Sequence, residues 1–225
     1  MKKKKNLIKY IIDAKKIKLN NNIILVAFNL AFAAFYFKNI IKLNEHLIVW
    51  PDGIFSKIFF KNKLIPGYEL IEKIKISNKI KKVIILGSAS ERSSIYLKKK
   101  FKKKITICDL PYGKLQNIYK KLPIIKKNYL YLITLPTPVQ EKIAMHISKK
   151  YRFFKIMCIG GGLAMASGEI KKSPFFLRYL GLEFIWRLRT DFFRRSKRLL
   201  VSILYFVESY KKQFWRKITF IKIDH

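Results

Sequence analysis

Residues 129–162 have the sequence YLYLITLPTPVQEKIAMHISKKYRFFKIMCIGGG, and this stretch decides the fold class. It begins with the apolar run Tyr129–Thr134, continues with the amphipathic stretch Pro138–Lys150, and closes with the apolar run Lys155–Ile159. Short runs that are apolar on both faces are typical of strands in a covered parallel sheet. The stretch is therefore predicted to form a strand–helix–strand unit with a right-handed crossover.

The same alternation extends toward the N-terminus. Four more apolar runs are predicted strands: Ile23–Phe28, Leu47–Trp50, Val83–Leu86 and Ile105–Asp109. A further helix is predicted over Ser90–Lys102, and the run from Ile23 to Phe37 is predicted to be a buried strand that leads into a helix. Such alternation predicts an α/β fold with a Rossmann-like, doubly wound, mostly parallel sheet.

The two ends of the chain differ from this centre. Residues 1–22 are rich in Lys and Asn and are predicted to form a frayed or surface-bound lead-in to an α/β domain over residues 23–168. After Gly168 strands are predicted to stop, and residues 169–225 are predicted to form a helical, basic and aromatic appendage.

The composition points to an anionic partner. The chain has 49 Lys and Arg against 13 Asp and Glu, a formal net charge of +36, which favours nucleic acid or a membrane with acidic lipids. Codon drift toward Lys, Ile and Asn is an alternative origin for the lysines, but it explains less well why arginines cluster between Arg178 and Arg198. No segment reaches the roughly 18–20 apolar residues of a membrane span, which predicts a cytoplasmic protein able to lie on the inner membrane face. Cys108 and Cys158 indicate neither a disulfide framework nor a metal site.

Residues suited to ligand contact follow the predicted strands, where ligands bind in open α/β sheets. They are Asn29, Asp52, Gly87, Asp109, Thr137, Gln140, Glu141, Gly160 and Gly161. Asp52 is a candidate general base, because an acid at a strand end can take a proton from an incoming hydroxyl. The alternative is that Asp52 caps a helix that begins near Ile54.

The turn Gly160-Gly161-Gly162 has two interpretations. Its backbone N–H groups could hold a diphosphate, or it could be a tight turn that allows close packing. Thr137 is a candidate N-cap, and Gln140 and Glu141 could contact a sugar or simply begin a helix. No Gly-rich loop has the G-x-G-x-x-G or Walker pattern, which disfavours dinucleotide binding and ATP hydrolysis.

The arginine cluster suits phosphate binding. Its members include Arg178, Arg187, Arg194 and Arg195, whose guanidinium groups can form bidentate pairs with phosphate oxygens. Trp186, Phe192 and Phe193 interleave with them, a mixture typical of a helix that lies in a lipid headgroup layer. A solvated basic face and an RNA-binding surface remain alternatives.

Three motifs together resemble a known family. They are the C-terminal series Gly160–Gly168, Lys171-Lys172-Ser173-Pro174 and Gly181–Arg189, the strand end Leu47–Gly53, and Leu135-Pro-Thr-Pro138-Val-Gln140-Glu141. In this order and spacing they resemble the WecG/TagA/CpsF family of glycosyltransferases. The ordered matches run from about Ile23 to Arg198.

The resemblance implies an inverting, metal-independent transfer from a UDP-sugar, with no cofactor. Family donors are typically N-acetylmannosamine derivatives or related hexoses, and acceptors are polyprenyl-diphosphate-linked sugars in cell-surface polysaccharide synthesis. Asp52 matches the family's base and Gln140 an active-site residue, while the arginine-rich appendage matches the segment that seats on the membrane. Residues 23–168 would then be the catalytic domain that binds the nucleotide sugar.

Two positions depart from the family pattern: Ala27 stands where Thr is common, and Leu64 stands where Arg is common. A catalytically inactive, membrane-associated homologue therefore stays an alternative, as does a basic nucleic-acid-binding α/β protein. The sequence names neither the sugar nor the acceptor glycan, and it leaves the oligomeric state open, a homo-oligomer included.

Overall fold

The structure is a computed structural model that describes residues 6–19, 22–38, 40–41, 44–60, 64–111, 113–189, 192–211 and 218–223. The chain divides into two compact units. Unit 1 comprises Met1–Ile12, Ala27–Pro66 and Ser173–Asp224, and unit 2 comprises Asp13–Val26, Gly67–Lys172 and His225. The functional division predicted at residues 22 and 168 stays a prediction.

Unit 2 is a parallel sheet with helices on both faces. Its strands follow the order β5-β4-β6-β7-β2, and every paired strand runs parallel to its neighbour. The strands are β2 (Ile23–Phe28), which continues into unit 1 at Ala27, β4 (Lys82–Leu86), β5 (Lys104–Cys108), β6 (Tyr129–Ile133) and β7 (Lys155–Cys158). The helices are η1 (Ala14–Lys16, a 3-10 turn), α3 (Gly67–Lys73), α4 (Glu91–Phe101), α5 (Leu115–Lys120), α6 (Val139–Lys150) and α7 (Gly162–Ala166).

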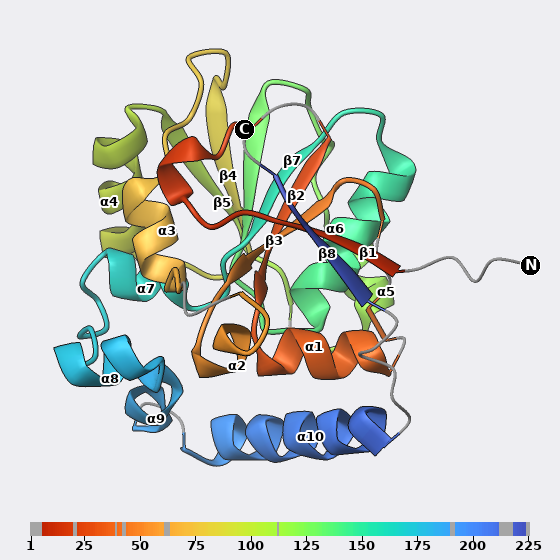
Figure 1. Ribbon diagram of the computed structural model, residues 1–225. Helices are drawn as coiled ribbons and strands as arrows, with labels where there is room; N and C mark the ends of the chain where they lie inside the picture. Colours follow the sequence, from red (N-terminus) through yellow and green to blue (C-terminus); the bar gives the residue numbers. More distant parts are fainter. Residues whose placement is uncertain are drawn as a thin grey trace, which may run out of the picture. The chain divides into compact units, whose positions relative to one another are not determined.

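The order of these strands confirms the doubly wound prediction. The chain passes outward from β4 to β5, then returns past β4 to β6 and β7, so the direction of winding reverses between β4 and β6. Helices α3, α4 and α7 lie on one side of the sheet, and α5 and α6 lie on the other (Figure 1). The six predicted strands all form, with ends that differ by one residue at most. Both faces are covered, which explains why the central strands are almost uniformly apolar.

Unit 1 contains two strands that the sequence analysis missed. Strand β1 (Asn6–Tyr10) pairs in parallel with β3 (Leu47–Pro51) on one side and with β8 (Ile218–Lys222) on the other. The prediction of a frayed lead-in is therefore wrong for residues 6–10, and Ile8 is buried there. The prediction that strands stop after Gly168 is also wrong, because β8 follows the helices.

The helices of unit 1 flank these strands in the sequence. They are α1 (Leu30–Phe37), α2 (Ile54–Lys57), α8 (Phe175–Leu180), α9 (Glu183–Leu188) and α10 (Phe192–Lys211). Helix α10 lies alongside α1 (Figure 1), where Phe35 contacts Tyr205 at a ring-centroid distance of 5.7 Å. The helical appendage therefore packs against its own chain. Within the described residues, no helix is both long and apolar enough to cross a membrane.

Aromatic rings form the centre of unit 1. Phe28, fully buried at the end of β2, contacts Phe55 at 6.2 Å, Phe60 at 5.2 Å and Phe220 at 5.5 Å between ring centroids. Offset and edge-on aromatic pairs of this kind stabilise a core beyond the area they bury. Because Phe220 lies on β8, the last described strand completes this core.

The turn at Gly160-Gly161-Gly162 packs closely against the backbone at the start of α3. A Cβ at Gly162 would lie 3.1 Å from the carbonyl carbon of Gly67 and 3.3 Å from the Tyr68 nitrogen, whereas one at Gly161 would meet nothing within 4 Å. Helix α3 therefore approaches the start of α7 as closely as it does only because Gly162 lacks a side chain.

We expect Gly162→Ala to destabilise the protein by about 1–3 kcal/mol, the usual effect of forcing an extra methyl group into packed structure. The matched Gly161→Ala variant is expected to stay within about 0.5 kcal/mol of the wild type. Urea unfolding monitored by circular dichroism measures both. Equal stability of the two variants would contradict the close contact.

Candidate functional site

Asp52 lies in unit 1 directly after β3, half-buried at the strand end. Its backbone N–H donates to the carbonyl of Phe28 (3.2 Å), and the amide nitrogen of Asn29 lies 3.5 Å from the Asp52 Oδ2 atom. The other end of the Asn29 side chain accepts from the Phe32 N–H (3.0 Å) and caps α1. Asn29 is thus fixed by the helix that it caps and faces Asp52 with its amide.

The interpretation of Asp52 as a helix cap is wrong. The N-cap position of α2 is Gly53, in a left-handed conformation with φ of 73°, and α2 has no side-chain cap. The Asp52 carboxylate is therefore not used to begin α2, which is compatible with a role in chemistry.

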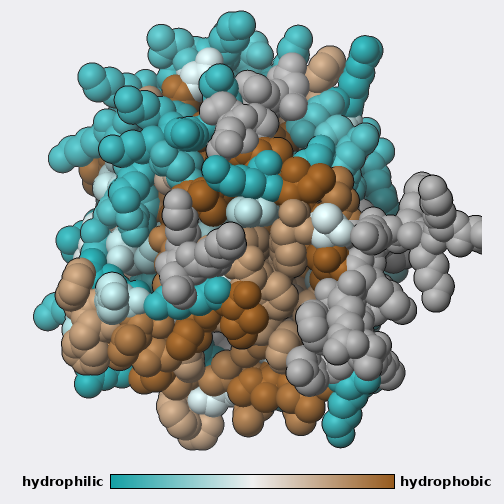
Figure 2. All heavy atoms as spheres, viewed as in Figure 1, coloured by the Kyte–Doolittle hydropathy of each residue, from teal (hydrophilic) through white to brown (hydrophobic). Residues whose placement is uncertain are grey.

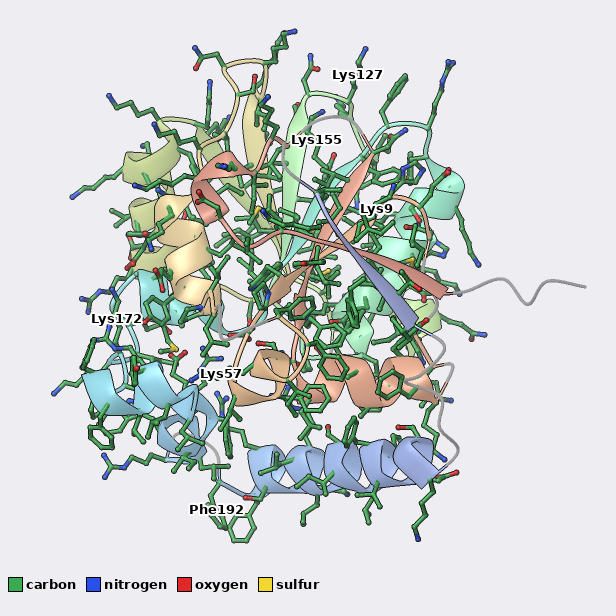
Figure 3. All side chains as sticks on the ribbon, viewed as in Figure 1. Lys9, Lys57, Lys127, Lys155, Lys172 and Phe192 are labelled. Carbon is green, nitrogen blue, oxygen red and sulfur yellow. The ribbon has the colours of Figure 1, made fainter. Side chains whose placement is uncertain are left out.

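The turn between α8 and α9 is seated on the segment after Asp52. The Ile54 N–H donates to the carbonyl of Gly181 (2.9 Å), and the Lys57 ammonium donates to the carbonyl of Tyr179 (2.9 Å; Figure 3). Gly181 has a φ of 75°, and a Cβ there would lie 2.7 Å from the Ile54 nitrogen. Only glycine fits, so the arginine-bearing helices begin at a fixed distance from the Asp52 loop. Leu64, one of the departures from the family pattern, also lies against this glycine.

Glu183 is the acidic residue of this region that the sequence analysis did not single out. It begins α9 and is only 7% exposed, and the Nη2 atom of Arg187 lies 3.6 Å from its Oε1 atom. Burial raises the pKa of the Glu183 carboxyl, and the nearby charge of Asp52 raises it further, while Arg187 and Arg178 oppose the rise. The sequence could have pointed to Glu183, because it is one of very few acidic residues within the arginine cluster.

Unit 1 thus brings together some of the predicted site residues. The charges of Arg178, Arg187 and Asp52 all influence the pKa of the buried Glu183 carboxyl, and the Nη2 atom of Arg187 lies 3.6 Å from its Oε1 atom. Arg195 is on α10 and is half-buried. The side chain of Arg194 lies outside the described residues.

A second group of predicted residues meets in unit 2. The buried carboxylate of Glu141 accepts from the Thr137 hydroxyl (2.9 Å) and from the Gln140 amide (2.9 Å). The side-chain oxygen Oε1 of Gln140 in turn accepts from the Gly160 N–H (3.1 Å). Gln140 therefore ties the start of α6 to the glycine turn after β7, and it is itself only 5% exposed.

This hydrogen-bond network bears on two sequence predictions: Thr137 as the N-cap of α6, and the role of the glycine turn. Thr137 does not cap α6, because its hydroxyl donates to Glu141 and the N-cap position is Pro138. The Gly160 N–H donates to the carbonyl of Ile133 as well as to Gln140, so it serves the turn. The contact between Gly162 and α3 likewise fits the tight-turn interpretation of this segment. The predicted substrate contacts of Gly160 and Gly161 stay predictions.

In doubly wound sheets, ligands usually bind beyond the carboxyl ends of the two strands between which the winding reverses. Here these strands are β4 and β6. Gly87 follows β4 there, with a φ of 119°, and a Cβ would lie 2.5 Å from the Thr134 hydroxyl oxygen at the end of β6. That hydroxyl donates to the carbonyl of Ser88 (2.9 Å) and joins the two strand ends. Asp109 follows the neighbouring strand β5 and is exposed.

Helices α8 to α10 carry an exposed apolar surface. Figure 2 shows hydrophobic side chains gathered over these helices, and Phe192 at the start of α10 points away from the protein in Figure 3. The most exposed members are Phe175 (73%), Phe176 (61%), Tyr179 (72%), Phe192 (60%), Phe193 (86%) and Leu204 (66%). Large apolar patches rimmed by polar residues mark sites of interaction with proteins or membranes. Among the described side chains, no group of three His, Cys, Asp or Glu residues is arranged to hold a metal ion.

Comparison with known proteins adds two findings. A family model described as "Glycosyl transferase WecG/TagA/CpsF family" matches residues 18–219. The chain is also similar to N-acetylglucosaminyldiphosphoundecaprenol N-acetyl-beta-D-mannosaminyltransferase from Staphylococcus aureus strains NCTC 8325 / PS 47, COL and MRSA252. Each relative is 25% identical over 146 residues, which cover 62% of this chain and 57% of the relative. The matched part thus spans little more than half of these relatives.

The raised pKa of Glu183 generates a prediction for stability. A buried carboxyl with a raised pKa loses stability when it ionises, so this loss begins as the pH rises through the ordinary value of 4.5 and is complete above the folded-state pKa. Glu183→Gln cannot ionise and is expected to melt about 2–4 °C above the wild type at neutral pH, the shift that about 1 kcal/mol produces in a chain of this length.

Thermal melts from acid to neutral pH test this prediction, and the difference should vanish below the ordinary Glu pKa. Glu45→Gln is the matched control, because the Glu45 side chain is 80% exposed and belongs to the same unit. A Glu183→Gln protein less stable than the wild type at neutral pH would show that the ion pair with Arg187 outweighs the burial.

Proposed function

The chain belongs to the WecG/TagA/CpsF family of glycosyl transferases, and from this we propose that it transfers a sugar from a UDP-sugar to a polyprenyl-diphosphate-linked acceptor. The donor sugar is an N-acetylhexosamine of the N-acetylmannosamine type or a related hexose, as the name of the similar staphylococcal proteins suggests. The reaction inverts the anomeric centre, uses no metal ion or cofactor, and serves cell-surface polysaccharide synthesis.

One observation carries this proposal: a half-buried acid at a strand end shares its surroundings with arginines from an adjacent helical segment. Asp52 supplies a proton acceptor, and Arg178 and Arg187 supply positive charge around the same position. Glycosyl transfer from a nucleotide sugar needs both, because a hydroxyl must lose a proton while a diphosphate gains negative charge. The hydrogen bond from the Ile54 N–H to the Gly181 carbonyl joins the segment after Asp52 to the turn between the arginine-bearing helices.

The chemical step is a single displacement. Asp52 takes the proton of the acceptor sugar hydroxyl, and the oxygen attacks the anomeric carbon from the face opposite the diphosphate. The bond from that carbon to the diphosphate oxygen breaks, and UDP leaves with the electron pair. Arg187 and Arg178, with Arg194 and Arg195 as further candidates, stabilise the charge that develops on the diphosphate. Gln140, Glu141 and Thr137 hold the glycine turn of unit 2 in place.

The exposed surface of α8 to α10 supports a peripheral position on an anionic membrane. Its aromatic and aliphatic side chains interleave with Arg189, Lys197 and Arg198, a pattern suited to the boundary between headgroups and acyl chains. A lipid-linked acceptor would then lie in the same layer as the arginines that bind the diphosphate of the departing UDP. The proposed location is the inner face of the bacterial cytoplasmic membrane.

Calorimetric titration of the purified protein with UDP, at about 0.15 M salt, is the first test. ADP and single-stranded RNA are the controls. Selective binding of UDP supports the proposal. RNA binding that falls steeply with salt, without a preference for UDP, would instead favour the nucleic-acid alternative.

We expect Asp52→Asn to lower the transfer rate by about 10²–10⁴-fold, the usual contribution of a positioned base. UDP binding should change little, because the substitution conserves shape and leaves the arginines in place. A radiolabelled transfer assay with a lipid-linked acceptor measures the rate, and Glu45→Gln is the control. Full activity of Asp52→Asn would overturn the base assignment. Transfer absent from the wild type, with UDP still bound, would favour the inactive homologue.

The membrane proposal predicts that replacing both Phe192 and Phe193 by Ser weakens binding to anionic vesicles at least about tenfold. Burial of one phenylalanine side chain contributes about 1.5–3 kcal/mol, so the loss of two exceeds that factor even with partial insertion. Vesicle co-sedimentation measures the effect. Ile124→Ser is the control, since Ile124 is 74% exposed but lies outside these helices. Equal losses in both proteins would contradict a specific surface.

A further inference from the structure

Three charged groups of the described residues influence the Glu183 carboxyl. Arg187, one turn further along α9, has its Nη2 atom 3.6 Å from the Glu183 Oε1 atom. The charges of Arg187 and of Arg178 on α8 lower the pKa of this carboxyl, and the charge of Asp52 after β3 raises it.

This region is fixed by backbone contacts. The chain enters α9 from Gly181, whose carbonyl accepts from the Ile54 N–H, and Ile54 is two residues beyond Asp52. The link is a backbone hydrogen bond at a position where only glycine fits, so it joins the turn before α9 to the segment that follows Asp52.

The compensation of the buried Glu183 charge is incomplete. The 3.6 Å separation from Arg187 is an ion pair beyond hydrogen-bond distance, and the buried Oε1 atom accepts no hydrogen bond among the described groups. Burial raises the pKa of this carboxyl even with the arginines present. A buried carboxylate that loses its positive partners normally takes up a proton.

A diphosphate competes for the same positive charge. Its oxygens match the planar guanidinium group better than one carboxylate oxygen at 3.6 Å does, and it brings more negative charge. Its arrival would both engage Arg187 and repel the Glu183 carboxylate, and each effect favours the protonated form of Glu183.

We propose that Glu183 is a built-in counter-ion of Arg187, which the diphosphate of the sugar nucleotide displaces, and that Glu183 takes up one proton from solvent as the diphosphate binds. This inference rests on the proposed function, because it takes a nucleotide diphosphate as the ligand. Glu183 acts through Arg187 and is a positioning residue. Proton-coupled binding also predicts that donor affinity falls with rising pH, by at most about tenfold per pH unit for one proton.

The test is titration calorimetry with UDP-N-acetylmannosamine in two buffers that differ in their heat of protonation. The diphosphate of this donor is esterified at both ends and keeps its charge near neutral pH, so any proton counted comes to the protein. The wild type is expected to show a buffer-dependent heat that corresponds to uptake of up to one proton. Glu183→Gln should bind with no uptake and with equal or higher affinity above neutral pH, and Glu45→Gln should behave as the wild type.

The outcomes separate this inference from the proposed function. Donor binding by the wild type with the same heat in both buffers would overturn the inference and leave the proposed function standing. Unchanged proton uptake in Glu183→Gln would overturn it as well, because the proton would then enter elsewhere. Failure of the wild type to bind the donor would count against the proposed function itself. The wild-type titration decides on proton uptake even where the variant folds poorly.

Discussion

The hydrogen bond from the Ile54 N–H to the carbonyl of Gly181 is the constraint on which the candidate chemistry depends. It joins the loop that carries Asp52 to the turn from which the arginine-bearing helix α9 begins, although these segments are far apart in the sequence. Because Gly181 admits no side chain, the contact fixes the backbone itself. Main-chain geometry thereby links the loop that carries the acid to the turn between the two arginine-bearing helices α8 and α9.

Burial opposes the negative charge of Glu183, and the ion pair with Arg187 offsets this opposition only in part. In the proposed function this weak ion pair is useful, because Arg187 can exchange the Glu183 carboxylate for the diphosphate of the donor. Sites that break the ordinary rules of burial are where function is most often found.

Much of the fold could be predicted from the sequence because the strands of unit 2 are apolar runs separated by amphipathic helices. Strands β1 and β8 could not, since β1 is a short run within lysine-rich sequence and β8 pairs with it across almost the whole chain. Asp52, Gln140 and Arg187 were predicted as site residues from their motifs, and these assignments stay predictions. The role of Gln140 as a link to Gly160, and the involvement of Glu183, depend on contacts between residues that no local pattern records.

The pairing of β1 with β8 has a consequence for synthesis on the ribosome. Strand β1 and its partner β3 are both translated early, but the other edge of β1 has no partner until β8 has been translated. Unit 2, whose strands and helices lie between residues 13 and 172, can complete its sheet while α8 to α10 are still being made. The nascent chain therefore carries an unpaired edge on β1 while α8 to α10 are being made, and the strand that pairs with this edge follows them. The unit that holds Asp52 therefore cannot complete its strand pairing before β8 has been translated.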